Sequence, residues 1–106
     1  MEKPKSKSVK YLYERYIEGN PELEALYEEE RTNAEIAMRV YGLRKEAGLT
    51  QKELADLIGT DQAVISRLED VDYQGHSLTM LRRIAAALGK RVQLTFVPLG
   101  GEASRS

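Results

Sequence analysis

Cysteine is absent from this chain of 106 residues, which excludes disulfide bonds and thiolate chemistry. Histidine occurs once, and the sequence has neither a glycine-rich phosphate loop nor a His/Cys cluster. The acidic residues lack the partner base or the metal geometry that a catalytic site needs. We therefore predict that the protein is not an enzyme, that it uses no metal or cofactor, and that His76 is a surface side chain.

Long apolar runs are missing as well. No stretch of the sequence approaches the ~20 apolar residues that cross a bilayer, and the first residues do not have the pattern of a signal peptide. We therefore expect a cytoplasmic protein that does not associate with a membrane.

An excess of one charge is also lacking, because 16 basic and 17 acidic residues leave a net charge of −1. Nucleic-acid-binding proteins are often strongly basic, so this balance argues weakly against that function, although a local basic patch is compatible with it. Hydrophobic residues make up 42% of the chain, which is enough for the modest core of a single domain.

The most informative stretch is 51–70, with the sequence QKELADLIGTDQAVISRLED. It indicates two short helices joined by a turn at Gly59, where a positive φ is expected. Ala55 is small at the point where the two helices would cross, and Ile65 and Leu68 mark the inner face of the second helix. This spacing is typical of a helix-turn-helix motif and predicts sequence-specific DNA binding.

Capping residues precede both helices of this motif. Thr50 and Glu53 have the spacing of a capping box at the start of the first helix. Asp61 stands where it would cap the second helix, over 62–69. Because the first N–H groups of a helix attract anions, we expect Gln51 to contact a phosphate group.

The outward face of the second helix carries side chains that suit base recognition. Glutamine can hydrogen-bond an adenine edge in two places, arginine can do the same to guanine, and alanine can contact a thymine methyl group. The alternative is that these side chains are merely solvated. The outward residues are Gln62, Ala63, Ser66 and Arg67, and the loop that follows adds Tyr73, Gln74 and His76 as candidates for phosphate contacts.

Before the motif, we expect a disordered segment at the N-terminus, followed along the chain by a helical segment. Residues 1–8 are polar and rich in lysine, which predicts disorder, with a basic arm on DNA as the alternative. Residues 9–32 are expected to form a helical extension, within which Asn20 caps a helix that starts at Pro21.

A second capping box, Thr32 with Glu35, predicts that a separate helix begins the DNA-binding domain, 33–89. One long helix is the alternative, because the apolar period is unbroken over 23–43. The residues expected on its buried side are Ile36, Ala37, Val40, Tyr41 and Leu43, and the residue expected to end it is Gly48. Arg44 on this helix and Glu69 are either an ion pair or two independent surface charges.

After the motif, the pattern predicts a helix and then a strand. Ser77 caps the helix over 78–88, whose expected core face consists of Leu78, Leu81, Ile84, Ala85 and Leu88. Val92, Leu94 and Phe96 then alternate with polar residues, which predicts a strand within 90–98. A lone strand needs a partner, so we expect it to pair with a second copy in a homodimer, or alternatively with another protein's sheet. The last segment, 99–106, is expected to be a flexible tail.

The stretch LRKEAGLTQKELADLIGTDQAVISRLED, followed by SLTMLRRIAAALG, resembles the XRE/Cro-C1-type helix-turn-helix family over about residues 36–89. The resemblance implies a mostly α fold, namely a five-helix lambda-repressor-like bundle. Asp61 departs from the family pattern, because phage-type members often have Thr or Ser there. By resemblance, Gln51, Gln62, Ala63 and Arg67 fall on DNA-contact positions, and Arg44 and Glu69 fall on a frequent buried ion pair.

The helical extension and the ending LGKRVQLTFVP resemble the layout of HigA- and HipB-type antitoxins of toxin–antitoxin systems. That resemblance implies a type II antitoxin, a repressor that binds a small basic toxin protein and controls its own operon through a palindromic operator. The toxin-contacting residues would be Leu23, Leu26, Tyr27, Glu28 and Glu29, on an acidic helix whose other interpretation is a solvated face. The remaining alternatives are a stand-alone regulator without a toxin and an interaction module that does not bind DNA.

Overall fold

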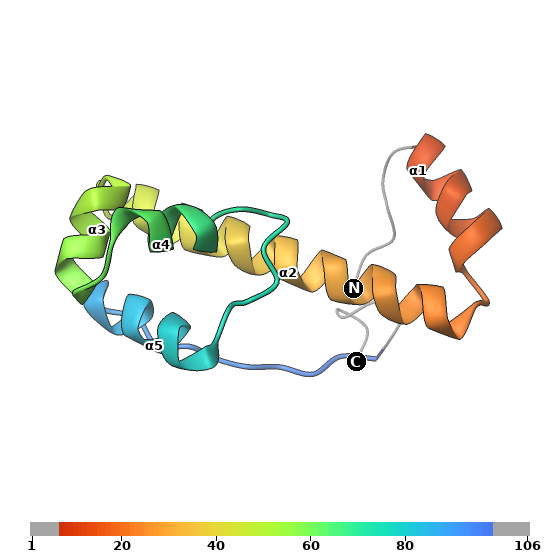
Figure 1. Ribbon diagram of the computed structural model, residues 1–106. Coiled ribbons are helices and arrows are strands. Elements are labelled where there is room, and N and C mark those ends of the chain that lie inside the picture. Colours follow the sequence, from red (N-terminus) through yellow and green to blue (C-terminus); the bar gives the residue numbers. More distant parts are fainter. Residues whose placement is uncertain (1–6, 99–106) are drawn as a thin grey trace. The chain divides into compact units, whose positions relative to one another are not determined.

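The computed structural model describes residues 7–98, and this part of the chain is mostly helical (Figure 1), as predicted. The helices are α1 (Lys7–Leu12), a π-helical segment η1 (Tyr13–Ile17), α2 (Pro21–Glu46), α3 (Gln51–Ile58), α4 (Gln62–Leu68) and α5 (Leu78–Ala87). Two compact units divide the chain. The four-helix unit is Glu30–Gln93 and contains most of α2 with α3, α4 and α5, whereas the N-terminal unit contains α1, η1 and the start of α2, together with residues 94–98.

Helix α2 begins and ends at the residues that the sequence indicates. The side-chain Oδ1 of Asn20 accepts a hydrogen bond from the backbone N–H of Leu23 at 3.2 Å, and Pro21 occupies the first helical position, where no N–H is needed. After the helix, Gly48 adopts a left-handed φ of 73°. This conformation is easily reached only by glycine and stops the helix.

The expected separate helix at Thr32 is wrong, because α2 continues through this residue without a break. No glycine or proline occurs between Pro21 and Gly42 to interrupt it, and inside a helix the backbone amides are already bonded, so a side-chain cap is not needed. The boundary predicted between 32 and 33 therefore falls within one continuous helix.

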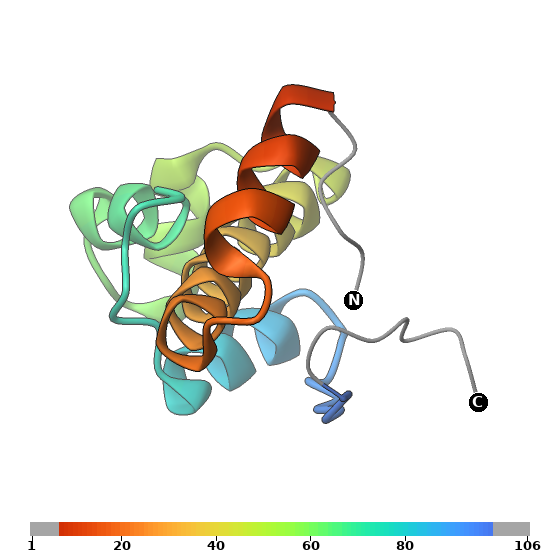
Figure 2. The same cartoon turned by 90° about the vertical axis from the view of Figure 1, so that its right-hand side faces the viewer.

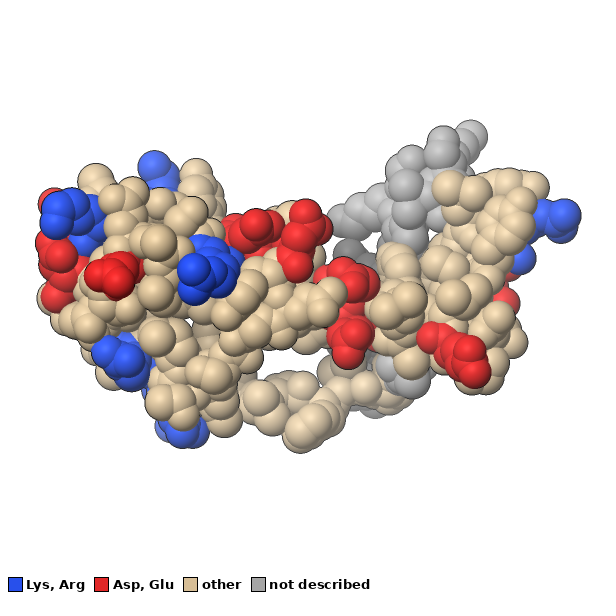
Figure 3. All heavy atoms as spheres, viewed as in Figure 1, with Lys and Arg blue, Asp and Glu red and all other residues tan. Residues whose placement is uncertain are grey.

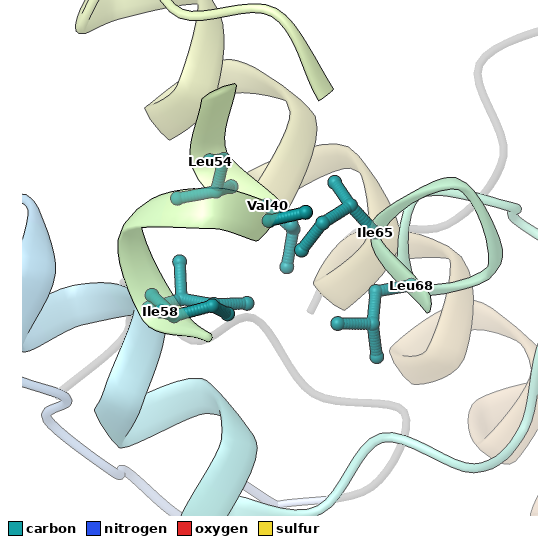
Figure 4. Packing of buried hydrophobic residues seen from close by; sticks show 7 residues of the cluster. Val40, Leu54, Ile58, Ile65 and Leu68 are labelled. Carbon is teal, nitrogen blue, oxygen red and sulfur yellow. The ribbon is translucent and has the colours of Figure 1, made fainter. Parts of the chain in front are cut away.

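The core of the four-helix unit lies where α3, α4 and α5 gather around the C-terminal part of α2 (Figures 1 and 2). The side chains of Val40, Leu54 and Ile65 converge from three helices (Figure 4). Ala55 is fully buried where α3 meets α4, so a larger side chain would force the two helices apart. The buried cluster consists of Val40, Leu54, Ala55, Ile58, Ile65, Leu68 and Ile84.

Two residues predicted for the core face are instead exposed. Tyr41 lies on the surface of α2, where its ring faces the guanidinium of Arg44 with 5.3 Å between that group and the ring centroid. Such a cation–π contact allows an aromatic ring to remain partly in water. Leu78 is the first residue of α5 and is also exposed. Ile84 and Ala85, further along the same helix, form its buried side as predicted.

The strand expected at Val92, Leu94 and Phe96 is not formed in the single chain. Residues 90–98 have no regular secondary structure, and Leu94 and Phe96 are 64% and 90% exposed. A strand exists only through hydrogen bonds to a neighbouring strand, and the described residues of one chain contain no second strand to provide them. Both apolar side chains are therefore left in water.

In the N-terminal unit, one aromatic contact joins η1 to the start of α2. Tyr13 is buried and meets the ring of Tyr27 edge to face, with 4.9 Å between the ring centroids. Leu23 and Leu26 are exposed, so the predicted apolar stripe is buried only at Tyr27, which is half-buried. Glu28 is buried rather than outward-facing. None of the described helices is both long enough and apolar enough to cross a membrane.

Candidate nucleic-acid interface

Helix α3 starts with a complete capping box, as predicted. The N–H of Glu53 donates to Thr50 Oγ1 at 3.0 Å, and the N–H of Thr50 donates to Glu53 Oε1 at 2.8 Å. The two bonds satisfy backbone donors that the first turn of a helix leaves unpaired. They fix the direction in which α3 leaves the preceding loop, and with it the position of Gln51.

The turn between α3 and α4 depends on Gly59, which has the predicted positive φ, 73°. The next amide, that of Thr60, donates to the carbonyl of Ala55 at 2.8 Å and closes the end of α3. Asp61 occupies the N-cap position of α4, but its side chain forms no capping hydrogen bond, so the expected cap is wrong. Its carboxylate is exposed at the start of α4.

Arg44 of α2 and Glu69, just after α4, form an ion pair inside the four-helix unit. The Nε and Nη2 atoms of Arg44 donate to the two carboxylate oxygens of Glu69 at 2.6 and 2.9 Å, and the two side chains are only 9% and 5% exposed. The hydrogen bond to Glu69 raises the pKa of the Arg44 guanidinium, burial lowers this pKa in part, and the charge of Glu69 raises it further. Arg44 Nη1 also donates to the carbonyl of Leu49 at 2.8 Å, which anchors the loop before α3.

The same carboxylate positions two of the predicted DNA contacts. Gln51 Nε2 donates to Glu69 Oε1 at 3.1 Å, and Gln62 Nε2 donates to Gln51 Oε1 at 3.5 Å. The amide groups at the start of α3 and at the start of α4 therefore belong to one network that ends on the buried ion pair. Such a network restricts the rotamers of both glutamines.

The outer face of α4 is open to solvent and has the residues that the sequence placed there. Arg67 is the only charged side chain within α4, and the buried side of the helix is formed by Ile65 and Leu68. On the face shown in Figure 3, the lysine and arginine atoms of the four-helix unit form separate patches with acidic atoms between them. The exposed residues of α4 are Gln62, Ala63, Ser66 and Arg67.

The loop after α4 engages its polar side chains within the unit. Tyr73 packs against the core cluster, and Gln74 Nε2 donates to Glu30 Oε1 at 2.9 Å. The Gln74 amide is therefore engaged here, so the phosphate contact predicted for it requires this side chain to move.

Two side chains from the segment after α4 bind backbone carbonyls at helix ends, and the sequence did not indicate either of them. His76, expected to be a surface side chain, is half-buried and places Nε2 2.6 Å from the carbonyl oxygen of Leu68, the last residue of α4. Arg83 Nη2 donates to the carbonyl of Ile58, the last residue of α3. Their carbonyl partners are set by tertiary folding, and no local spacing reveals them.

The described residues include no group of three or more His, Cys, Asp or Glu side chains that could hold a metal ion. What the surface offers is a capped helix start, a row of exposed polar side chains on α4 and one exposed arginine. These are groups for hydrogen bonding and phosphate contact.

Comparison with known proteins gives two matches. The model of the family described as helix-turn-helix matches residues 40–94. A protein of Methanothermobacter thermautotrophicus named "Uncharacterized HTH-type transcriptional regulator" is 49% identical over 47 residues, which cover 44% of this chain and 67% of that protein. No solved structure shows a significant match.

Proposed function

The chain belongs to the helix-turn-helix family, and from that premise we propose that it is a sequence-specific DNA-binding transcriptional regulator that acts as a repressor. The observation that carries the proposal is the outer face of α4. Its exposed polar side chains match the hydrogen-bonding edges of bases in the major groove, and its inner face packs on the core. The relative from M. thermautotrophicus, named as a transcriptional regulator, supports the same function.

Because the net charge is close to zero, DNA affinity has to come from local groups. We assign base contacts to Gln62, Ala63, Ser66 and Arg67, and a phosphate contact to Gln51 at the N-terminus of α3. We also assign phosphate contacts to Tyr73 and Gln74, and the Gln74 contact requires that its side chain leave Glu30. Because Arg67 is the one cation among these assigned contacts, the interface should form few ion pairs with phosphates and show a shallow dependence of affinity on salt.

Binding to the DNA upstream of the protein's own gene tests this proposal. We expect preference for that DNA over unrelated DNA of the same length, and we expect Arg67→Ala to reduce the preference by about 1–3 kcal/mol. Arg39→Ala is the matched control, because it removes one exposed arginine from α2, outside the helix-turn-helix. Equal affinity for both DNAs in the unaltered protein would refute sequence-specific binding.

We further propose that two copies pair through the segment that contains Val92, Leu94 and Phe96. Two exposed apolar side chains at alternating positions, with 64% and 90% exposure for Leu94 and Phe96, support pairing with an identical strand. A two-fold dimer would place two α4 helices in major grooves about 34 Å apart on a palindromic operator.

Substitutions on alternating positions test the dimer. The double variant Leu94→Glu/Phe96→Glu should be monomeric in sedimentation experiments with an unchanged helical content, because these side chains are largely exposed in the single chain. The control Gln93→Glu/Thr95→Glu adds the same charge at the intervening positions and should remain dimeric. A dimer that survives the first pair of changes contradicts pairing through this face.

A second candidate function, that of a type II antitoxin, is favoured by the charge of the N-terminal unit. Within this unit, residues 16–29 contain five acidic residues and no basic one, and Leu23 and Leu26 are exposed among them. This surface opposes DNA and fits a small protein that is basic around an apolar patch. We place the half-buried Tyr27 and the exposed Glu29 at the same surface, whereas the buried Glu28 would only support it.

Co-expression with a small basic protein encoded beside the gene tests the antitoxin proposal. The two proteins should copurify and the complex should bind the upstream DNA. The variant Leu26→Ala/Glu29→Lys should lose the partner, whereas Glu46→Lys, an exposed charge reversal at the end of α2, should keep it. Specific DNA binding without any such partner would favour a stand-alone regulator, and a partner without DNA binding would favour a pure interaction module.

A further inference from the structure

We propose that His76 is a positioning residue for DNA recognition, because it holds the last turn of α4 in the conformation that presents Ser66 and Arg67. The inference rests on the proposed DNA-binding function. It concerns a residue outside the helix-turn-helix itself, one that reaches back to the end of α4 from the following loop.

Helix α4 needs such support, because it has only seven residues. An isolated helix of this length is unstable in water, and the carbonyl groups of its last turn have no partners within the helix. Ser66 and Arg67 belong to that last turn. Fraying there would displace both side chains, and a bidentate base contact tolerates only about 0.5 Å of displacement.

The carbonyl of Leu68 is the group that His76 satisfies. Its Nε2 lies 2.6 Å from the Leu68 oxygen in a half-buried position, so the ring is the donor and Nε2 carries the hydrogen. The amides of Glu69 and Asp70 close the same turn by donating to Ile65 and Arg67 at 3.1 Å each. The histidine therefore completes the hydrogen bonding at the end of α4.

The loop is built to hold this ring in place. Tyr73 meets His76 edge to face, with 5.1 Å between the ring centroids, and also packs against the core. The Tyr73 ring lies so close to Gly75 that a Cβ at this position would be only 2.6 Å from Cζ. A glycine at 75 thus lets the loop fold tightly enough for His76 to reach Leu68.

The test compares three full-length proteins: the unaltered chain, His76→Phe and His76→Gln. Phenylalanine keeps a ring beside Tyr73 but has no donor, whereas the glutamine side chain restores an N–H at about the distance of Nε2. The first measurement is amide hydrogen exchange in the free protein. We expect His76→Phe to accelerate exchange at Glu69 and Asp70 by about two- to tenfold, with α3 amides unchanged and with His76→Gln close to the unaltered chain.

The second measurement is the ratio of affinities for the upstream DNA and for unrelated DNA. His76→Phe should lower this ratio by about two- to tenfold, and His76→Gln should restore it. Unaltered exchange and an unaltered ratio in His76→Phe would overturn the proposal. So would equal losses in the phenylalanine and glutamine variants, since those would indicate a role in packing alone.

The two measurements also separate this inference from the proposed function. If the unaltered protein does not discriminate between the two DNAs, the proposed function fails, while the exchange rates still report whether His76 holds α4. If His76→Phe does not fold, His76→Asn replaces it, because its shorter amide does not reach the Leu68 carbonyl from the same backbone position. Exchange as slow in this variant as in His76→Gln would then refute the role of the Nε2 donor.

Discussion

Arg44 and Glu69 lie 25 residues apart in the chain and form a bidentate ion pair, with 2.6 and 2.9 Å between donor and acceptor atoms. The pair joins α2 to the end of α4, and Gln51 of α3 donates to the same carboxylate. Three helices therefore meet at a single buried acidic group. Through Gln51 the group is also linked to Gln62 of α4.

We predict that Glu69→Leu destabilises the protein strongly, because it leaves the buried guanidinium of Arg44 without its counter-charge. The expected loss is about 3–5 kcal/mol in the free energy of unfolding, measured by urea denaturation. The double variant Arg44→Met/Glu69→Leu should recover much of this loss. Lys52→Ala, which removes an exposed ion pair with Asp56, should change stability by less than about 1 kcal/mol. If Glu69→Leu and Lys52→Ala lowered the free energy of unfolding by similar amounts, burial would not be what makes the Arg44–Glu69 pair important.

Two threonines that precede a glutamate by three residues should respond differently to alanine. Thr50→Ala removes the cap of α3 and should cost about 1 kcal/mol of stability. Thr32 lies inside α2, where alanine has the higher helix propensity. Thr32→Ala should therefore leave the stability unchanged or raise it by about 0.5 kcal/mol. Thermal unfolding of the two variants measures the difference. A comparable loss at Thr32 would indicate that α2 is interrupted there.

Two glycines should respond to alanine with opposite signs. Gly59 has a φ of 73°, so Gly59→Ala should cost about 1–2 kcal/mol. Gly42 lies within α2 with no atom near the position of an added Cβ, so Gly42→Ala should stabilise by about 0.5–1 kcal/mol. Chemical denaturation gives both values. Destabilisation by Gly42→Ala would mean that another molecule or a second copy packs closely against α2 at this point.

Asp61 should be dispensable for folding and unfavourable for DNA binding. Its side chain makes no capping hydrogen bond, so Asp61→Asn should leave the unfolding temperature nearly unchanged. Loss of a negative charge at the start of α4 should raise the affinity for DNA by about threefold at low ionic strength, and by less as salt increases. Asp61→Ala, which removes any possible cap, should also leave the unfolding temperature nearly unchanged, and a loss of about 1 kcal/mol in that variant would indicate that the side chain caps α4 after all.

Local signals predicted well where the helices α2, α3 and α5 begin. Asn20 with Pro21, Thr50 with Glu53, and Ser77 start helices as expected, because a cap needs only residues a few positions apart. Thr32 failed although its spacing is the same as that of Thr50. A capping box starts a helix only where the preceding residues are not helical, and here α2 continues from Pro21.

Long-range contacts were less predictable. From the residues alone, the ion pair between Arg44 and Glu69 was one of two alternatives, the other being two independent surface charges. Helical periodicity could not decide between them, because it does not report the distance between separate helices. His76 and Arg83 were missed because each donates to a backbone carbonyl, and every residue has one. Val92, Leu94 and Phe96 have the alternation of a strand, yet no strand forms, because pairing requires a second segment that the described part of this chain does not contain.

The amino-acid sequence by itself determined the order of the helices, the glycine turn and the exposed row of residues on α4, because helix caps, apolar spacing and positive φ values act over a few residues. Only the tertiary structure decided which side chains hold that row in place. Burial makes the Arg44–Glu69 pair and the His76–Leu68 bond strong constraints, and burial exists only once the helices have packed.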